Sequence, residues 1–216
     1  MKGLLRNRFP AAAFVVGIVG LTVGLVRAVL DSAHPTYPLG AVLLALYLAW
    51  VLLEVPITLR TAASASSEDD RGSEQIYGVA RLVTMLTAAL GPVPWSSWQP
   101  WLVLSPLFLL CGVALRLTSI HALGRFYSHR VRLVDDHQIV TTGPYRLVRH
   151  PSYTGMLLAN AGLVLYFANP VSVMAFALLF VPAVVNRILV EERAMFTVPG
   201  YHEFALGRKR LAPFVW

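Results

Sequence analysis

The chain has 216 residues, of which 56% are hydrophobic and only 13% are charged, and its mean hydropathy is +0.63. A soluble domain carries about 25% charged residues, so this composition excludes an ordinary soluble protein and predicts an all-α integral membrane protein. The net charge of +7 is not accompanied by the aromatic and basic stripe typical of nucleic-acid binding. We therefore expect membrane lipid, and no nucleic acid, as the partner of the basic residues.

Six apolar stretches are long enough, or nearly long enough, to cross a bilayer, which takes about 20 mostly apolar residues. They cover approximately residues 10–30, 38–59, 76–91, 100–120, 153–168 and 171–190. The first stretch exceeds the apolar core of a signal peptide, about 7–15 residues, and no small-residue cleavage site follows it, so we interpret it as a retained span. Because the third and fifth stretches are short, we predict a bundle of five to six transmembrane helices.

The distribution of basic residues predicts the orientation of this bundle. With the N-terminus inside, the outer segments are residues 31–37, 92–99 and 169–170, and they contain no Lys or Arg. Lys and Arg collect on the cytoplasmic side of short loops, so we expect both termini and the polar C-terminal segments at the cytoplasmic face. Arg outnumbers Lys by 16 to 2, a bias typical of GC-rich genomes, and we therefore expect a bacterial cell membrane.

Small residues repeat on one face of the first and fifth stretches. They are Gly17, Gly20 and Gly24 in the first, and Gly155, Ala159 and Gly162 in the fifth. Such a face can line a passage for a cofactor or lipid, or it can let a neighbouring helix approach closely. We favour close helix packing. Asn169-Pro170 is a turn signal, so the fifth and sixth stretches should form a tight hairpin that returns the chain to the same membrane face.

The segment HQIVTTGPYRLVRHPSYTG, residues 137–155, is the first candidate for chemistry. Gly143-Pro144 predicts a turn, and Pro151 suits the first turn of a helix. Free backbone N–H groups at such a helix start attract a carboxylate or phosphate. The basic residues here could simply contact headgroups. We favour a site because four polar or aromatic side chains fall within nine residues, namely Tyr145, His150, Ser152 and Tyr153.

The segment RILVEE, residues 187–192, is the second candidate. Arg187 and Glu191 are four residues apart and share a helix face, whereas Glu192 points about 100° away. An exposed intrahelical ion pair would contribute only about 0.3–0.5 kcal/mol, which is little reason to keep two carboxylates near lipid. Arginine binds anions through two parallel hydrogen bonds, and a carboxylate binds a ribose diol or an ammonium group. We therefore interpret this segment as part of a binding site.

Other polar residues are weaker candidates. His121, His129 and His137 lie eight residues apart with no cysteine pair, so no metal site is predicted. Glu54, late in the second stretch, and Arg116, late in the fourth, are interpreted as side chains that reach toward the membrane interface. The sequence has no Gly-x-Gly dinucleotide fingerprint and no Walker-type phosphate loop.

GPYRLVRHPSYTG, NP and RILVEE, in this order, resemble the C-terminal signature of the isoprenylcysteine carboxyl methyltransferase family. They are also similar to the broader group of membrane phospholipid methyltransferases. The resemblance covers about residues 121–216 and implies a methyltransferase-like catalytic region there, with a helical hairpin over about 153–190. Residues 1–120 would then be N-terminal transmembrane helices. The implied cofactor is S-adenosylmethionine (S-adenosyl-L-methionine), bound at the cytoplasmic face.

The resemblance also implies roles for individual residues. By position, the cofactor would be bound by His137, Gln138, Ile139, Val140, Tyr145, His150, Pro151, Ser152, Tyr153 and Glu191. Arg187 would contact the acceptor, and Arg187, Glu191 and His150 would be the catalytic residues. The sequence departs from the family pattern at Arg130, where eukaryotic relatives have glutamine, and at Phe204, where a tyrosine is common.

The implied function is transfer of a methyl group to a carboxyl or hydroxyl of a lipophilic acceptor, such as an isoprenoid, phenolic or pyrone lipid. A carboxylate acceptor needs no general base, but a hydroxyl acceptor would need one, for which His150 or Glu192 is a candidate. Two alternatives remain open: an NADPH-dependent sterol-type membrane reductase, and a small transporter or lipid-binding protein. The pairing of Arg187 with Glu191 favours methyl transfer, and a transporter would concentrate ionisable residues at mid-membrane.

Overall fold

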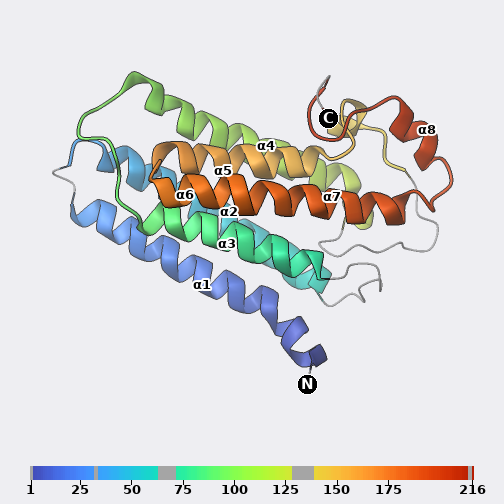
Figure 1. Cartoon of the computed structure of the whole chain (residues 1–216), viewed down its shortest axis with the longest axis horizontal. Coiled ribbons are helices and arrows are strands. Elements are labelled where there is room, and N and C mark those ends of the chain that lie inside the picture. The colour runs from blue at the N-terminus through green and yellow to red at the C-terminus, as the bar shows by residue number, and fades with distance from the viewer. Residues whose placement is uncertain (1, 32–33, 63–71, 128–138, 214–215) are drawn as a thin grey trace.

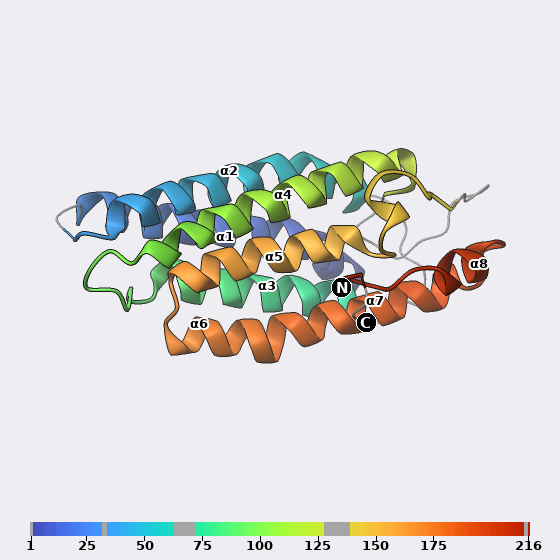
Figure 2. The same ribbon diagram turned by 90° about the horizontal axis from the view of Figure 1, so that it is seen from above.

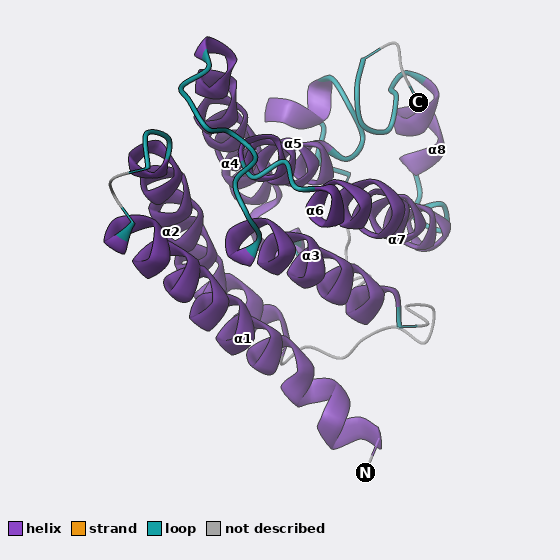
Figure 3. Ribbon diagram, turned by 60° about the vertical axis from the view of Figure 1, so that its left-hand side comes forward, coloured by secondary structure: helices purple, strands orange, loops and turns teal. Residues whose placement is uncertain are grey.

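The structure is a computed structural model that describes residues 2–31, 34–62, 72–127, 139–213 and 216. Within these ranges the chain forms helices joined by loops (Figure 3), together with a single-residue parallel bridge between Val148 and Lys209. The predicted all-α class is therefore confirmed. This is the outcome expected of an apolar chain in lipid, where a helix satisfies its backbone hydrogen bonds within itself.

The long helices lie side by side as a bundle, and the short C-terminal helix lies at one end of it (Figures 1 and 2). The α-helices are α1 (Lys2–Leu30), α2 (Tyr37–Ala62), α3 (Ser73–Leu90), α4 (Leu104–Leu123), α5 (Pro151–Tyr166), α6 (Pro170–Met174), α7 (Val181–Met195) and α8 (Tyr201–Leu206). The 3-10 turns are η2 (Pro100–Val103), η3 (Gly124–Phe126) and η4 (Gly143–Arg146), and a π-helical stretch, η5 (Ala175–Phe180), joins α6 to α7.

Four helical segments of the described chain are long and apolar enough to cross a membrane, fewer than the five to six predicted. They are Ala11–Leu30, Tyr37–Thr58, Pro100–Leu123 and Pro170–Met195. The two shorter stretches of the prediction correspond to α3 and α5, with 18 and 16 residues, which lie alongside the four (Figure 2). Helix α3 is less apolar than a full span because it contains polar and charged residues, and α5 is shorter than a full span.

The chain turns between α5 and α6 at Asn169-Pro170. Pro151 is the first residue of α5, where its missing N–H leaves no helical bond unmade. At the turn that follows α5, the side-chain oxygen of Asn169 accepts a hydrogen bond of 2.9 Å from the backbone N–H of Ser172, and Pro170 begins α6. As a result, the end of α7 returns to the end of the bundle where α5 begins (Figure 1).

Small residues bring neighbouring helices into backbone contact. A Cβ atom on Gly155 of α5 would lie 2.5 Å from the carbonyl oxygen of Gly112 in α4, and one on Gly162 would lie 2.5 Å from that of Ser105. On α1, a Cβ on Gly24 would lie 2.6 Å from the carbonyl oxygen of Ala89 in α3. These distances leave no room for a side chain, so close helix packing is confirmed as the role of these faces.

The continuous helix formed by α6, η5 and α7 is π-helical over Ala175–Phe180, so each backbone hydrogen bond there spans one residue more than in an α-helix. Pro182, the second residue of α7, has no N–H to donate to the preceding turn, which is a common cause of such a local change in helix geometry. The widened turn is packed against α3, where Phe180 lies with its ring centroid 5.8 Å from that of Tyr77. It therefore helps to position a tyrosine that lines the cavity described next.

Candidate active site

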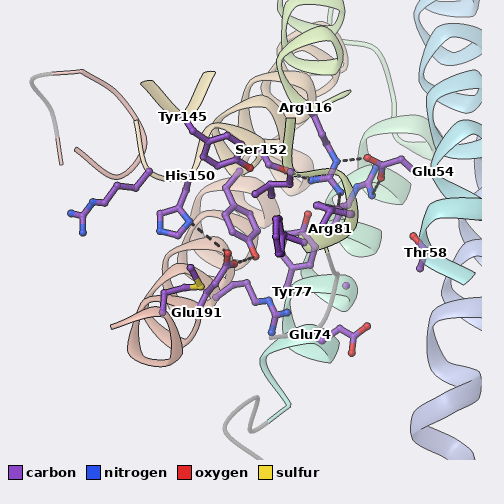
Figure 4. Close-up of a pocket in the computed structure, with 18 of the residues that line it drawn as sticks. Glu54, Thr58, Glu74, Tyr77, Arg81, Arg116, Tyr145, His150, Ser152 and Glu191 are labelled. Atoms are coloured by element: carbon purple, nitrogen blue, oxygen red, sulfur yellow. Dashed lines mark hydrogen bonds and ion pairs between the residues drawn. The ribbon is translucent and has the colours of Figure 1, made fainter. Parts of the chain in front are cut away.

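A cavity lies where the start of α5 and the end of α7 meet α2, α3 and α4 (Figure 4). Its empty space, open parts included, is about 1640 Å³. The predicted site residues that line it are Ile139, Val140, Tyr145, His150, Ser152, Tyr153, Arg187 and Glu191. Pro151 begins α5 beside them without lining the cavity, and His137, Gln138 and Arg130 lie outside the described residues. The two segments singled out in the sequence thus meet in one place.

Glu191 is the carboxylate that faces the cavity. One of its oxygens, Oε2, accepts a hydrogen bond of 2.8 Å from the hydroxyl of Tyr153, and Oε1 lies 4.0 Å from Nδ1 of His150 (Figure 4). Its side chain keeps 34% of its surface exposed. The hydrogen bond joins residues 38 positions apart in the chain, and it leaves part of the carboxylate accessible to a ligand.

Glu192, the next residue, is held by basic side chains instead. Its Oε1 lies 2.8 Å from Nη1 of Arg149 and 3.2 Å from Nε2 of His150, and its Oε2 lies 2.7 Å from Nε of Arg210. Only 4% of its side chain is exposed, and it is not among the residues that line the cavity. Glu192 is therefore a poor candidate for the general base that a hydroxyl acceptor would need.

The C-terminal tail fixes the backbone of the first segment. The N–H of Arg149 donates to the carbonyl of Lys209 at 2.8 Å, and the N–H of His150 donates to that of Arg210 at 2.9 Å. The hydroxyl of Thr154 donates to the carbonyl of Leu211 at 2.6 Å. The sequence contained no local signal for this pairing, because a backbone contact between a loop and a distant tail depends on where the helices bring both.

Arg187 reaches from α7 to the start of α3. Its side chain is 2% exposed, and Nη1 donates a hydrogen bond of 2.6 Å to the hydroxyl of Ser73. Glu191, on the same face of α7, is bonded to Tyr153 of α5. The two residues therefore connect α7 to two different helices, and both line the cavity.

Glu54 and Arg116 do not reach toward the membrane interface, and that prediction is wrong. Their side chains are 1% and 3% exposed and form a buried ion pair in which Nε of Arg116 donates to Oε1 of Glu54. Arg81 of α3, which the sequence reasoning missed, lies with Nη1 at 3.1 Å from Oε2 of the same carboxylate. Charges that cannot reach water are stable in a bundle when opposite charges meet there.

This ion cluster also connects to the first candidate segment. Nη1 of Arg116 donates to the hydroxyl of Ser152 at 2.9 Å, and Nη2 donates to that of Tyr127 at 3.2 Å. The indole N–H of Trp50 donates to Glu54 at 3.1 Å. The only available signal in the sequence was that Glu54 and Arg116 lie near the same ends of two predicted spans, which places them at a similar depth.

Two tyrosines give the cavity neutral hydroxyl groups near its polar end. Burial raises the pKa of Tyr145 well above its ordinary value, and the nearby Glu191 carboxylate raises it further. Burial likewise raises the pKa of Tyr201, with a further contribution from Glu192. Both phenols therefore stay protonated at neutral pH. Phe204 lies with its ring centroid 5.6 Å from that of Tyr201, so this part of the cavity offers aromatic surface beside hydrogen-bonding groups.

Comparison with known proteins supports the family resemblance that the sequence motifs suggest. Residues 103–197, from the start of α4 to the end of α7, match the model of the isoprenylcysteine carboxyl methyltransferase family. The match covers 95 of the 216 residues, so this part of the chain resembles the family. The matched region contains His150, Tyr153, Arg187 and Glu191, which belong to the motifs that suggest the family. Tyr77, Arg81 and Glu54 lie outside the region that the family model covers.

Several curated methyltransferases of this family are similar to the chain. Protein-S-isoprenylcysteine O-methyltransferase B of Arabidopsis thaliana is 35% identical over 111 residues, which cover 50% of this chain and 56% of that protein. The protein-S-isoprenylcysteine O-methyltransferases of Saccharomyces cerevisiae and Homo sapiens are 36% identical over 93 residues and 31% identical over 107 residues. These cover 42% and 47% of this chain, and 39% and 38% of the relatives. The chain thus spans about half the length, or less, of the curated relatives it matches.

Proposed function

We propose that the chain is an integral membrane methyltransferase that uses S-adenosylmethionine to methylate a carboxyl or hydroxyl of a lipophilic acceptor. The main support for this proposal is that a single cavity is lined by polar residues at one end and by apolar residues elsewhere. At one end it contains the polar cluster of His150, Tyr153, Arg187 and Glu191. It also extends to apolar residues of three other helices, namely Phe14 of α1, Val51 of α2, and Leu82 and Met85 of α3. The cavity therefore offers polar groups to a charged cofactor and apolar surface to the hydrocarbon chain of an acceptor.

The residues near the polar end fit the cofactor. When bound, S-adenosylmethionine supplies a methyl group activated by a positively charged sulfur. The partly exposed carboxylate of Glu191 can bind hydroxyl or ammonium donors and favours a positive charge nearby. The neutral phenols of Tyr145 and Tyr201 and the ring of Phe204 can hold a planar heterocycle. Family position adds His137, Gln138, Ile139 and Val140 to this set, and Ile139 and Val140 line the cavity.

The acceptor would be held beside this cluster. Arg187 is proposed to orient an acceptor carboxylate toward the methyl group that the bound cofactor would supply. A carboxylate is already a nucleophile, so the protein contributes mainly position and exclusion of water. For a hydroxyl acceptor, His150 is the candidate base, because it lines the cavity and Glu192 holds its other side.

The proposed orientation follows from the arrangement of the chain ends. The start of α1 and helix α8 lie at the same end of the bundle as the start of α5 and the end of α7 (Figure 1). The basic loops predict that this end faces the cytoplasm. The cofactor would then enter from the cytosol of a bacterial cell, and the acceptor would enter from the bilayer.

The test is methyl transfer by the purified full-length protein in detergent. Membranes from cells with and without the gene supply the acceptor, and methyl-tritiated cofactor labels it for lipid extraction. We expect label in the lipid fraction only with the protein, and cofactor binding between about 1 μM and 1 mM, the range in which enzymes hold their substrates. NADPH oxidation by the same membranes would favour the reductase alternative. Failure to bind the cofactor at millimolar concentration would refute the proposal.

A further inference from the structure

The cavity has an apolar branch that runs along α3, away from the polar end. Three helices contribute its lining, namely Ala13, Phe14 and Gly17 of α1, Val51 of α2, and Leu82 and Met85 of α3. Tyr77 and Arg81 of α3 line the cavity nearer the polar end, on the same face of the helix as Met85. From Tyr77 to Met85 this face extends about 12 Å, at about 1.5 Å per residue.

The direction of the helices shows where the branch ends. Helices α1 and α3 begin at the end of the bundle that holds the polar cluster, and α2 finishes there (Figure 1). The deepest lining residue is therefore the last one on α1 and on α3, and the first one on α2. These residues are Gly17, Met85 and Val51, so the branch passes no further than one level along each helix.

Beyond that level, α1 and α3 are in direct contact. A Cβ atom on Gly20 would overlap Cδ2 of Leu86, and one on Gly24 would lie 2.6 Å from the carbonyl oxygen of Ala89. Leu21 of α1 is fully buried in the same core. These contacts leave no room for a ligand between the two helices, so the branch has a closed end.

Met85 forms the wall at this closed end. A Cβ atom on Gly17 would lie 2.9 Å from Cε of Met85, which shows that the terminal methyl group lies against the backbone of α1. The side chain of Met85 is buried among neighbouring helices. A hydrocarbon chain longer than the branch would have to displace these packed groups. Overpacking of this kind lowers affinity by about five- to 150-fold.

We propose that Met85 and Gly17 limit the length of the hydrocarbon chain that the protein accepts. The inference rests on the proposed methyltransferase function and adds a length limit to its acceptor, whose head group would stay at the polar end while its chain passes Tyr77 and stops at Met85. Selection by length is thereby assigned to α1 and α3, which lie outside the region matched by the family model.

The test measures the binding of straight-chain fatty acids, from octanoic to octadecanoic acid, to the full-length protein in detergent. Saturating S-adenosylhomocysteine is present, so that no methyl transfer occurs. Each affinity in a variant is divided by the wild-type affinity for the same acid, because partition of the acid into micelles then cancels. In the wild type, affinity should fall about tenfold or more above one chain length, which defines the limit.

Two variants should move this limit in opposite directions. Met85→Ala removes the wall beyond Cβ and should shift the limit to longer acids. Gly17→Ala pushes Cε of Met85 into the branch and should shift it to shorter acids. Affinity for the shortest acids should stay the same in both. Gly20→Ala is the matched control, because it disturbs the same contact between α1 and α3 without lining the cavity, and it should keep the wild-type limit.

Opposite shifts cannot arise from a general loosening of the bundle. The inference is overturned if the wild type binds no acid, shows no limit within the series, or shares its limit with both variants. Titration of S-adenosylhomocysteine alone separates this inference from the proposed function. A protein whose limit moves as expected but that does not bind this compound would retain the length limit and refute the methyltransferase proposal.

Discussion

Glu191 and Glu192 are neighbours in the chain but have opposite surroundings. Successive residues of a helix point about 100° apart. Glu191 therefore faces the cavity, where it accepts a hydrogen bond from Tyr153 and stays partly exposed. Glu192 is directed to the other side, where three basic side chains surround it. The structure thus separates a carboxylate available to a ligand from one that holds the site together. Their identical chemistry makes the pair a clean internal comparison.

Glu191→Gln and Glu192→Gln should therefore have different effects. Glu191→Gln should weaken binding of S-adenosylmethionine by about 10- to 100-fold, the cost of a charged hydrogen bond, with little change in Tm. Glu192→Gln leaves the partly buried Arg149 and Arg210 without a counter-charge and should lower the free energy of unfolding by about 1–3 kcal/mol. Calorimetric titration and thermal unfolding in the same detergent measure both effects. Equal loss of Tm in the two variants would contradict this assignment.

At the scale of elements, α5 depends on α4 for its position. The glycine contacts between them bring the two backbones together, and Arg116 of α4 donates to Ser152 in the first turn of α5. The same arginine binds Glu54 of α2, which also binds Arg81 of α3. Four helices are thereby tied at one level of the bundle. The start of α5, which presents the proposed site, is fixed by these contacts and by the C-terminal tail.

Gly155→Ala tests the packing of α5 on α4. The added Cβ would lie 2.5 Å from the carbonyl oxygen of Gly112 and 2.7 Å from the backbone nitrogen of Arg116. Overpacking of this kind costs about 1–3 kcal/mol, so Tm should fall, and cofactor binding should weaken as Arg116 shifts. Gly207→Ala is the control, since a Cβ there meets nothing within 4 Å. A Gly155→Ala variant as stable as the control would contradict the close contact.

At the scale of the molecule, the polar residues are distributed unevenly along the bundle. The proposed site, α8 and the start of α1 lie at one end, and the loop between α3 and α4 lies at the other (Figure 1). In a membrane, this arrangement places a water-soluble ligand at one face only. Under the proposed function, it would also bring that ligand close to an acceptor whose apolar part stays among the helices.

Cysteine labelling in intact bacterial cells tests this orientation. In a Cys111→Ser background, Ser96→Cys in the α3–α4 loop should react with a membrane-impermeant maleimide, whereas His202→Cys in α8 should react only after the cells are opened. Both native side chains are exposed, so access to the reagent depends on the membrane side. The reason for the expected result is the absence of basic residues from the α3–α4 loop. Labelling of position 202 in intact cells would reverse the orientation.

Local signals in the sequence were enough for the class of fold and for the elements around the site. Apolar composition predicts helices in lipid, Pro151 predicts the start of α5, and Asn169-Pro170 predicts the hairpin that brings residues 150 and 191 together. Each depends on residues close to one another in the chain. Other features depend instead on how each helix is rotated and at what depth it meets its neighbours. These features are the partners of Glu54, Arg81 and Arg116, the pairing of the tail with the start of α5, and the position of Tyr77 in the cavity wall. Those quantities are set by side-chain packing between distant segments, so the tertiary structure alone decided them.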